Sequence, residues 1–570
     1  MWAPDAGRVD VVIGDERHAM QEHGRGWWRA SIPSAGPGTD YMLSVDSGKP
    51  RPDPRSPWQP EGVQGPSRVV DGDSYTWRDA GWTGLPHSAA VIYELHVGAF
   101  TEEGTFDAAA ERLDHLDELG VNAVELCPVN EFSGEWGWGY DGVDLFAPHH
   151  AYGDPDSLKR LVDACHARGL AVILDVVYNH LGPAGNYLST FGPYFTDRYS
   201  TPWGQAVNFD GPGSYEVRRF VVDNALMWLR DYRFDGLRID AVHAILDTSA
   251  VHILEQMAME VAALEATTGR AKFLIAESDL NDPRVVRERG AGGYGVDAQW
   301  SDDFHHSLHA LLTGERTGYY SDFGSVADVA KALRQAFVYD WRYSSFRRRM
   351  HGRAPIGLPG HRFLAYLQDH DQVGNRARGE RSSALMSTSL LEVAAALVTT
   401  APFVPMLFMG EEWGASTPFQ YFTSHPDREL GRAVSEGRRR EFRGFGWDPE
   451  KVPDPQDPET FRRSKLDWSE VDEEPHKAIL EWHRGLIALR RSTPDLNDYD
   501  LAGVGVDYSE EGRWLVMSRG SIVVACNFSP DVRTVPVPED AELLLASVRP
   551  GTNGPRTLAG ESVAVYRKAP

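Results

Sequence analysis

The middle of the chain alternates short apolar runs with segments of helical periodicity. Helical patterns separate most of the runs, at Ala108–Leu119, Pro155–Arg168, Val217–Tyr232 and Ser249–Ala266. An apolar run of four to eight residues fits a strand that is buried on both faces, as in a parallel sheet. Strand and helix in repeated alternation predict an α/β fold, a (β/α)8 TIM barrel. The predicted strands are Val91–Val97, Val121–Leu126, Leu170–Val177, Phe234–Ile239, Lys272–Ala276, Val296–Trp300, Phe363–Leu367 and Phe403–Met409.

The two ends of the chain have a different pattern. Residues 1–86 alternate apolar and polar positions in short runs, such as Val9–Ile13, with Gly, Pro, Asp and Ser between them. This pattern predicts an N-terminal immunoglobulin-like β-sandwich, and a similar pattern in residues 497–570 predicts a C-terminal antiparallel β-domain. The catalytic barrel then spans residues 87–496. Residues 178–214, after the third strand, are too many for an ordinary loop and predict an insertion over the barrel mouth.

Composition narrows the possible partners. The formal net charge is −26, whereas nucleic acids and anionic membranes need a positive surface, so neither is expected as a partner. No stretch approaches the roughly 20 apolar residues that cross a bilayer. The three cysteines lie far apart and outside metal-ligand spacings, which predicts reduced thiols in a cytoplasmic protein. A monomer or a homodimer is expected. The chain has 17 Trp and 21 Tyr, whose flat rings are suited to stacking on sugar faces, although many of them will pack in the hydrophobic core.

Asp240 stands directly after the fourth predicted strand, and Arg238 lies two residues before it. Alternation along a strand puts the two side chains on the same side. A guanidinium beside a carboxylate keeps it ionised, as a nucleophile or a fixed anion requires. Taken alone, the pair also fits a purely structural ion pair, so the choice depends on the other strand ends.

Three other predicted strands end in similar chemistry. Strand three is followed by His180, strand five by Glu277 and strand seven by Asp371. In a barrel these positions converge on one mouth. Three carboxylates there suggest a retaining glycoside hydrolase, which needs a nucleophile about 5–5.5 Å from a proton-donating carboxylic acid. Asp240 fits the nucleophile. Glu277 fits the acid because it has no basic partner in the sequence, although a single strand-end carboxylate can also be structural.

These four strand ends resemble the four signature regions of the α-amylase family of glycoside hydrolases. By that resemblance, Asp240 is the nucleophile, Glu277 the general acid/base and Asp371 the carboxylate that stabilises the transition state. The resemblance also assigns three residues to the glucose unit at the cleaved bond: Arg238, His180 and His370. For the two histidines a metal site is the alternative, but their neighbours lack a compact ligand spacing.

The stretch Gly137-Trp138-Gly139-Tyr140-Asp141 follows the second predicted strand. It resembles the family segment that carries the ring on which this glucose stacks. The alternative is a glycine-rich turn around a core tryptophan.

Several longer stretches narrow the resemblance to the maltooligosyltrehalose trehalohydrolases within that family. They include Asp240-Ala-Val-His243-Ala-Ile245, Asp302-Asp303-Phe-His305-His306 and His370-Asp371-Gln372-Val-Gly-Asn375. The resemblance implies hydrolysis, with retention, of the α-1,4 bond beside the terminal trehalose of maltooligosyltrehalose. The further substrate-binding candidates are Trp138, Tyr140, Asp141, His243, Asp302, Asp303, His305, His306, Asp369, Gln372 and Asn375. The alternatives are a branching or debranching enzyme of the same family, or an inactive glucan-binding protein.

Two of these stretches leave questions open. The segment from Asp302 to His306 is a candidate for trehalose contacts, but it also fits a helix N-cap followed by exposed histidines. Asp369 departs from the family, which usually has Asn there, and an added carboxylate could raise a nearby pKa. The family's amylases often hold calcium near the third-strand insertion. Residues 178–214 contain no cluster of carboxylates that calls for it, so no cofactor or metal is expected.

Overall fold

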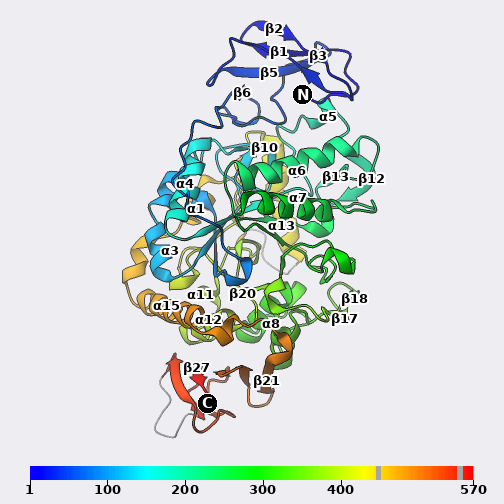
Figure 1. Ribbon diagram of the computed structural model, residues 1–570. Coiled ribbons are helices and arrows are strands. Elements are labelled where there is room, and N and C mark those ends of the chain that lie inside the picture. Colours follow the sequence, from blue (N-terminus) through cyan, green and yellow to red (C-terminus); the bar gives the residue numbers. More distant parts are fainter. Residues whose placement is uncertain (445–450, 549–555, 569–570) are drawn as a thin grey trace.

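The computed structural model describes residues 1–444, 451–548 and 556–568 (Figure 1). Its centre is a closed barrel of parallel strands in the order β11-β14-β15-β16-β19-β20-β7-β8. Each strand lies within one of the predicted runs, so the predicted barrel is confirmed. The strands are β7 (Ile92–Leu95), β8 (Ala123–Leu126), β11 (Ala171–Val176), β14 (Gly236–Ile239), β15 (Phe273–Ala276), β16 (Ala298–Trp300), β19 (Phe363–Ala365) and β20 (Val404–Phe408).

The strand register brings the chemical groups together. Asp175 on β11 is the register partner of Arg238 on β14. On the next pair, Ile239 of β14 stands opposite Ala276 of β15. The residues that follow these two, Asp240 and Glu277, therefore leave the barrel side by side.

Helices cover the outside of the barrel (Figure 1). Three predicted helices are present with bounds that shift by a few residues: α4 (Pro155–Ala167), α6 (Ser214–Arg230) and α7 (Ile253–Thr268). The side chain of Asp154 caps α4 by accepting the backbone N–H of Ser157 at 2.7 Å. The prediction of one helix over Ala108–Leu119 is wrong. This segment forms two short helices, α2 (Phe106–Ala110) and α3 (Leu113–Leu119), and the side chain of Thr105 caps the first of them. Other helices that matter below are α8 (Asp302–Thr313), α10 (His370–Gly374), α13 (Arg428–Gly444) and α15 (His476–Ser492).

The N-terminal and C-terminal β-domains lie at opposite ends of the molecule (Figure 1). The N-terminal part has a sheet in the order β2-β1-β5-β6 and a separate pair, β3 and β4. Their bounds are β1 (Val9–Ile13), β2 (Glu16–Ala19), β3 (Gln21–Glu22), β4 (Trp28–Arg29), β5 (Asp40–Val45) and β6 (Ser67–Arg68). We propose a boundary near residue 86 on the N-terminal side of the barrel and another near residue 496 after α15.

The C-terminal sheet has the order β21-β22-β23-β27-β25. Its strands are β21 (Val504–Ser509), β22 (Trp514–Arg519), β23 (Ile522–Asn527), β25 (Glu542–Ala546) and β27 (Ser562–Arg567). Along the edge strand β21, the buried Val504 and Val506 alternate with the exposed Gly505 and Asp507.

The segment after β11 contains a hairpin of β12 (Phe195–Thr201) and β13 (Gly204–Val207). Trp203, in the turn of this hairpin, stacks on His180 with ring centroids 4.6 Å apart. The predicted insertion therefore reaches the barrel mouth. Among the described residues, no helix is both long and apolar enough to span a membrane.

Candidate functional site

Arg238 is fully buried and lies at the centre of the charged residues in the barrel mouth. Its Nη1 donates to Oδ1 of Asp240 at 2.9 Å and to both oxygens of Asp175 at 2.9 and 3.0 Å. Its guanidinium carbon lies 4.3 Å from the ring centroid of Trp300. The electron-rich face of the ring attracts the cation.

Glu277 lies on the other side of the same guanidinium. Its Oε2 accepts the backbone N–H of Ala241 and lies 3.6 Å from Nη2 of Arg238. The expectation that the acid has no basic partner is therefore wrong. Nevertheless, burial raises the pKa of Glu277 well above its usual value, and Asp240 and Asp371 add to this rise while Arg238 opposes it. Burial and the neighbouring negative charges outweigh the single cation, so the protonated form of the carboxyl group is favoured.

Asn179 and Asp175 were not among the candidates, although Asp175 lies near the end of the third predicted strand and Asn179 two residues after it. The side-chain N–H2 of Asn179 donates to Oδ2 of Asp240 at 2.6 Å and to its backbone carbonyl at 2.9 Å. It fixes the rotamer of Asp240. Burial raises the pKa of Asp175 to about 6, against the opposing effect of Arg238.

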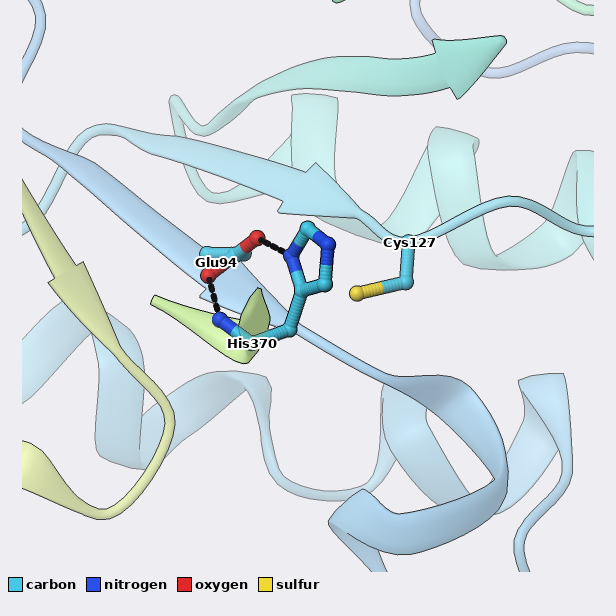
Figure 2. A group of neighbouring side chains, drawn as sticks. All are labelled: Glu94, Cys127 and His370. Atoms are coloured by element: carbon cyan, nitrogen blue, oxygen red, sulfur yellow. Dashed lines mark hydrogen bonds and ion pairs between the residues drawn. The ribbon is translucent and has the colours of Figure 1, made fainter. Parts of the chain in front are cut away.

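His370 is buried below the mouth, where it contacts Glu94 (Figure 2). On its other side lies Tyr140. Nδ1 of His370 donates to Oε1 of Glu94 at 2.5 Å, and Nε2 of the same ring donates to the hydroxyl of Tyr140 at 2.7 Å. Tyr140 in turn donates to Asp175 at 2.6 Å. Burial opposes a charged ring, but Glu94 and Asp371 raise the pKa of His370 to about 10. A chain of hydrogen bonds thus runs from Glu94 to Arg238.

Cys127 completes a close group with Glu94 and His370, and their possible ligand atoms lie within 4.8 Å of one another (Figure 2). A metal ion would need a free imidazole nitrogen and a thiolate. Here both ring nitrogens of His370 already have hydrogen-bond partners, and burial raises the pKa of the Cys127 thiol well above its usual value. The group fits a hydrogen-bonded support for Tyr140 better than a metal centre.

Asp371 is the most accessible of the three predicted carboxylates, with 42% of its side chain exposed. It lies in the first turn of α10 and accepts the side-chain N–H2 of Asn375 at 3.1 Å. Asp369 is the N-cap of the same helix and accepts the backbone N–H of Gln372 at 2.7 Å. Asp369 therefore has a structural function as a helix cap. Asn and Asp cap helices equally well, so Asp369 can do what the Asn usual in the family would do.

A pocket of about 230 Å³ opens beside Asp240 and Asp371. Six predicted candidates line it, namely Trp138, Tyr140, Asp141, His180, Asp240 and Asp371, together with Trp203, which was not predicted. Trp138 is held in place by a stacked contact with Phe419 and by its Nε1–H, which donates to the carbonyl of Gln420. Aromatic rings and fixed polar groups in one concave site are suited to a sugar.

The candidates on α8 have other partners. Asp303 accepts the backbone N–H groups of Val338 and Tyr339, and His305 contacts the carbonyl of Leu367 through Nδ1. Both His305 and His306 are buried, so the alternative of exposed histidines is wrong, and Ser301, not Asp302, is the N-cap. The spacing in the sequence could not separate these internal contacts from substrate contacts.

Two candidates from the α8 and β14 segments remain near the mouth. Asp302 accepts a hydrogen bond from the hydroxyl of Tyr366 at 2.5 Å, and its negative charge is one of those that raise the pKa of Glu277.

His243 lies in the short 3₁₀ turn Val242–Ala244, just after Asp240. The backbone N–H of Val242, the first residue of this turn, donates to the backbone carbonyl of Glu277. Gln372 is 3.4 Å from the hydroxyl of Tyr320.

Comparisons with known proteins agree with this geometry. Residues 66–194 match the family described as alpha amylase, catalytic domain, and residues 500–565 match a family described as a domain of unknown function. The chain is 52% identical to the malto-oligosyltrehalose trehalohydrolase of Arthrobacter ramosus over 100% of this chain and 99% of that protein. It is also 52% identical to the one from Rhizobium sp. (strain M-11), over 95% and 93% of the two chains. A putative alpha amylase structure from Salmonella typhimurium superposes with a TM-score of 0.92 at 39% identity, over 100% and 97% of the two chains. The chain belongs to the malto-oligosyltrehalose trehalohydrolase family.

Proposed function

We propose that this protein hydrolyses the α-1,4-glucosidic bond next to the terminal α,α-trehalose of maltooligosyltrehalose, releasing trehalose and a maltooligosaccharide. One observation carries the chemistry. The buried Arg238 donates a hydrogen bond to Asp240, while burial raises the pKa of the neighbouring Glu277 well above its usual value. A retaining glycosidase needs a nucleophilic carboxylate beside a carboxylic acid that can donate a proton. Membership of the trehalohydrolase family supports the choice of substrate.

In the first step, Glu277 gives its proton to the glycosidic oxygen while Asp240 attacks the anomeric carbon. The bond to the leaving oxygen breaks, trehalose departs with the proton, and a β-glycosyl ester forms on Asp240. In the second step, the ionised Glu277 takes a proton from water, which attacks the same carbon and frees Asp240. Two inversions give net retention.

Three further roles follow from the contacts. Asp371, close to the cleaved bond and partly exposed, offers negative charge to the cationic transition state. Asn179 and Arg238 fix the attack direction of Asp240 through two separate hydrogen bonds. The pocket with Trp138 and Tyr140 takes the glucose unit that becomes attached to Asp240.

The leaving trehalose has to lie on the side of Glu277, because the acid must reach the glycosidic oxygen. Asp302 follows β16, the strand next to β15, and lies on that side of the mouth. We therefore keep Asp302 as the candidate for a trehalose hydroxyl, and Asp303 and His305 as supports of α8.

A comparison of two substrates tests this function. The protein is incubated with maltopentaose that carries a terminal trehalose and with plain maltopentaose. Free trehalose from the first, with little cleavage of the second, is the expected result. Equal cleavage of both would exclude the trehalose specificity, transfer products would indicate a branching enzyme, and binding without cleavage would indicate an inactive glucan-binding protein.

We also propose a reducing, cytoplasmic location. Cys127, Cys165 and Cys526 are buried and unpaired among the described residues, which supports it.

A further inference from the structure

We propose that a pocket on the outer surface of the barrel, here called the side pocket, binds a chain of α-1,4-linked glucose away from the catalytic site. The side pocket has a volume of about 470 Å³ and lies between residues 70–77, the start of α4 and the end of α6. Helix α4 precedes β11 and α6 follows it, on the outside of the barrel (Figure 1). Among the described residues, none lines both the side pocket and the pocket beside Asp240. The side pocket therefore takes no part in cleavage, and this inference goes beyond the proposed function.

Three aromatic rings give the side pocket flat apolar walls. Tyr75 and Trp77 meet edge to face, with ring centroids 5.0 Å apart. The guanidinium carbon of Arg233 lies 4.5 Å from the ring centroid of Trp77 and holds that ring in place. Tyr232 adds a third ring, from the loop after α6. Flat rings beside polar groups are suited to the faces of sugars.

A buried ammonium group supplies a polar anchor in the side pocket. Only 4% of the Lys159 side chain is exposed, although the residue lines the pocket. Its Nζ lies 5.8 Å from the ring centroids of Tyr75 and Tyr232. The group has three N–H donors, and within the described part of the chain one acceptor lies in hydrogen-bond range, the carbonyl of Gly72 at 3.2 Å. A buried donor without an acceptor is costly, so a ligand hydroxyl here is favourable.

The charges of the side pocket are balanced, which favours an uncharged ligand. Arg230 donates through Nε to Asp231 at 2.7 Å, and Arg233 donates to Asp79. The third cation, the ammonium group described above, lies 3.6 Å from Oδ1 of Asp156. Each cation that lines the pocket thus has a carboxylate beside it, so an anionic ligand meets no uncompensated positive charge. Hydroxyl groups can still bind the remaining N–H groups and the carboxylate oxygens.

A buried ion cluster fixes the wall that carries Tyr75 and Trp77. Two residues after Trp77, Asp79 accepts a hydrogen bond at 2.9 Å from Nδ1 of His166 on α4. The other ring nitrogen of His166 donates to Asp235, directly before β14, also at 2.9 Å. The wall is therefore tied to both a helix and a strand of the barrel. A pocket that is preformed in this way loses little entropy when a ligand binds.

The proposed substrate is a chain of glucose units, and for this reason we choose an α-1,4-glucan among uncharged polyhydroxyl ligands. The choice of ligand rests on the proposed function. A long chain held in the side pocket keeps its free end close to the enzyme and raises the effective concentration of that end at the barrel mouth. The side pocket should therefore matter for long glucans and not for short trehalose-capped oligosaccharides.

Substitution of Arg230 tests the side pocket. Arg230 and Arg284 are both more than half exposed, and each donates through Nε to a nearby aspartate, Asp231 or Asp282. Of the two, Arg230 alone lines the side pocket, so Arg284→Ala is a matched control. The binding of soluble glycogen is measured by its retardation of the full-length protein in native gels. We expect the apparent Kd to rise about fivefold in Arg230→Ala and about tenfold in Trp77→Ala, and to stay at the wild-type value in Arg284→Ala.

A variant of the first pocket separates the two sites. Trp138→Ala removes a ring at the barrel mouth and should leave the retardation by glycogen largely intact. Arg230→Ala should keep kcat/KM for maltosyltrehalose within about twofold of wild type, because that short substrate reaches only the mouth. Glycogen contains no trehalose, so the retardation succeeds or fails independently of the substrate test above.

Two results would overturn the side pocket. Retardation that is lost in Trp138→Ala but unchanged in Arg230→Ala and Trp77→Ala would place all glycogen binding at the mouth. Release of the protein from glycogen by inorganic phosphate, with no release by maltotriose, would show that the side pocket takes an anion. Release by maltotriose alone is the expected result.

Discussion

Glu94 and His370 form a buried ion pair beneath the barrel mouth, with Oε1 of Glu94 2.5 Å from Nδ1 of the imidazole. The other oxygen of Glu94 accepts the backbone N–H of His370 at 3.1 Å. The carboxylate thus fixes both the charge and the orientation of the ring. It was missed in the sequence because Glu94 lies inside the first predicted strand and not at its end.

The Glu94–His370 pair should stabilise the fold in a pH-dependent way. Because Glu94 raises the pKa of His370 to about 10, the pair stabilises fully below the unfolded pKa of about 6.5 and loses this contribution as pH rises through about 10. The free energy of unfolding of wild type minus that of Glu94→Gln should therefore shrink from pH 7 to pH 10, by at most about 1.4 kcal/mol per pH unit. Chemical denaturation at several pH values measures the difference. A difference independent of pH would show that His370 is neutral.

The fold, and the convergence of the three catalytic candidates on one barrel mouth, could be predicted from sequence where the signal was local. Each barrel strand lies within a mainly apolar run, Asp240 and Glu277 stand directly after such runs, and Asp371 follows the seventh run by four residues. By contrast, Asn179, Glu94 and Trp203 act through partners that are distant in sequence. No local pattern can reveal such partners.

The α8 segment shows the opposite error. Its acids and histidines in one short stretch resemble a binding motif, yet Asp303 satisfies two backbone N–H groups and His305 a buried carbonyl. Polar residues at a strand end are needed for structure as well as for chemistry. Only their partners distinguish the two.

Asp302 should shift the alkaline limb of the pH–rate profile. In the proposed mechanism activity requires protonated Glu277, so kcat/KM should fall as pH rises through the pKa of that group. The negative charge of Asp302 helps to raise this pKa, after burial and the other two carboxylates. Asp302→Asn should therefore move the limb to lower pH. Asp282→Asn, which removes a charge bound to Arg284, is the control and should leave the limb in place. If the alkaline limb does not move in Asp302→Asn, the charge of Asp302 does not influence the pKa of Glu277.

Arg238→Lys should lower kcat far more than an exchange that conserves charge usually does. One guanidinium nitrogen contacts Asp175 and Asp240, and the other approaches Glu277. A single ammonium group cannot make all these contacts. We expect kcat to fall by about 10²-fold, since Asp240 loses its alignment, with circular dichroism unchanged. A variant that keeps more than half of the wild-type kcat would show that Asn179 alone aligns Asp240.

Glu277→Gln should lower kcat by about 10²–10⁴-fold without loss of fold, because the amide cannot donate a proton to the leaving oxygen. Activated substrates that need no acid, such as aryl glycosides with a good leaving group, should regain part of the first step. Equal loss on natural and activated substrates would point to another acid.

Asp369 offers a test of stability with a clear sign. As N-cap of α10 it should tolerate Asn, whereas Asp369→Ala should lower the free energy of unfolding by about 1 kcal/mol because the N–H of Gln372 loses its acceptor.

The same residue should also make stability depend on pH. Burial and then Glu94 raise the pKa of Asp369 well above its usual value. A carboxyl group with a raised pKa costs stability as pH rises from its unfolded pKa of about 3.9 toward the folded one. Asp369→Asn does not titrate, so its free energy of unfolding should exceed that of wild type by a margin that grows from pH 5 to pH 8. An Asn variant as unstable as the Ala variant would contradict the capping assignment, and a margin that does not change with pH would contradict the raised pKa.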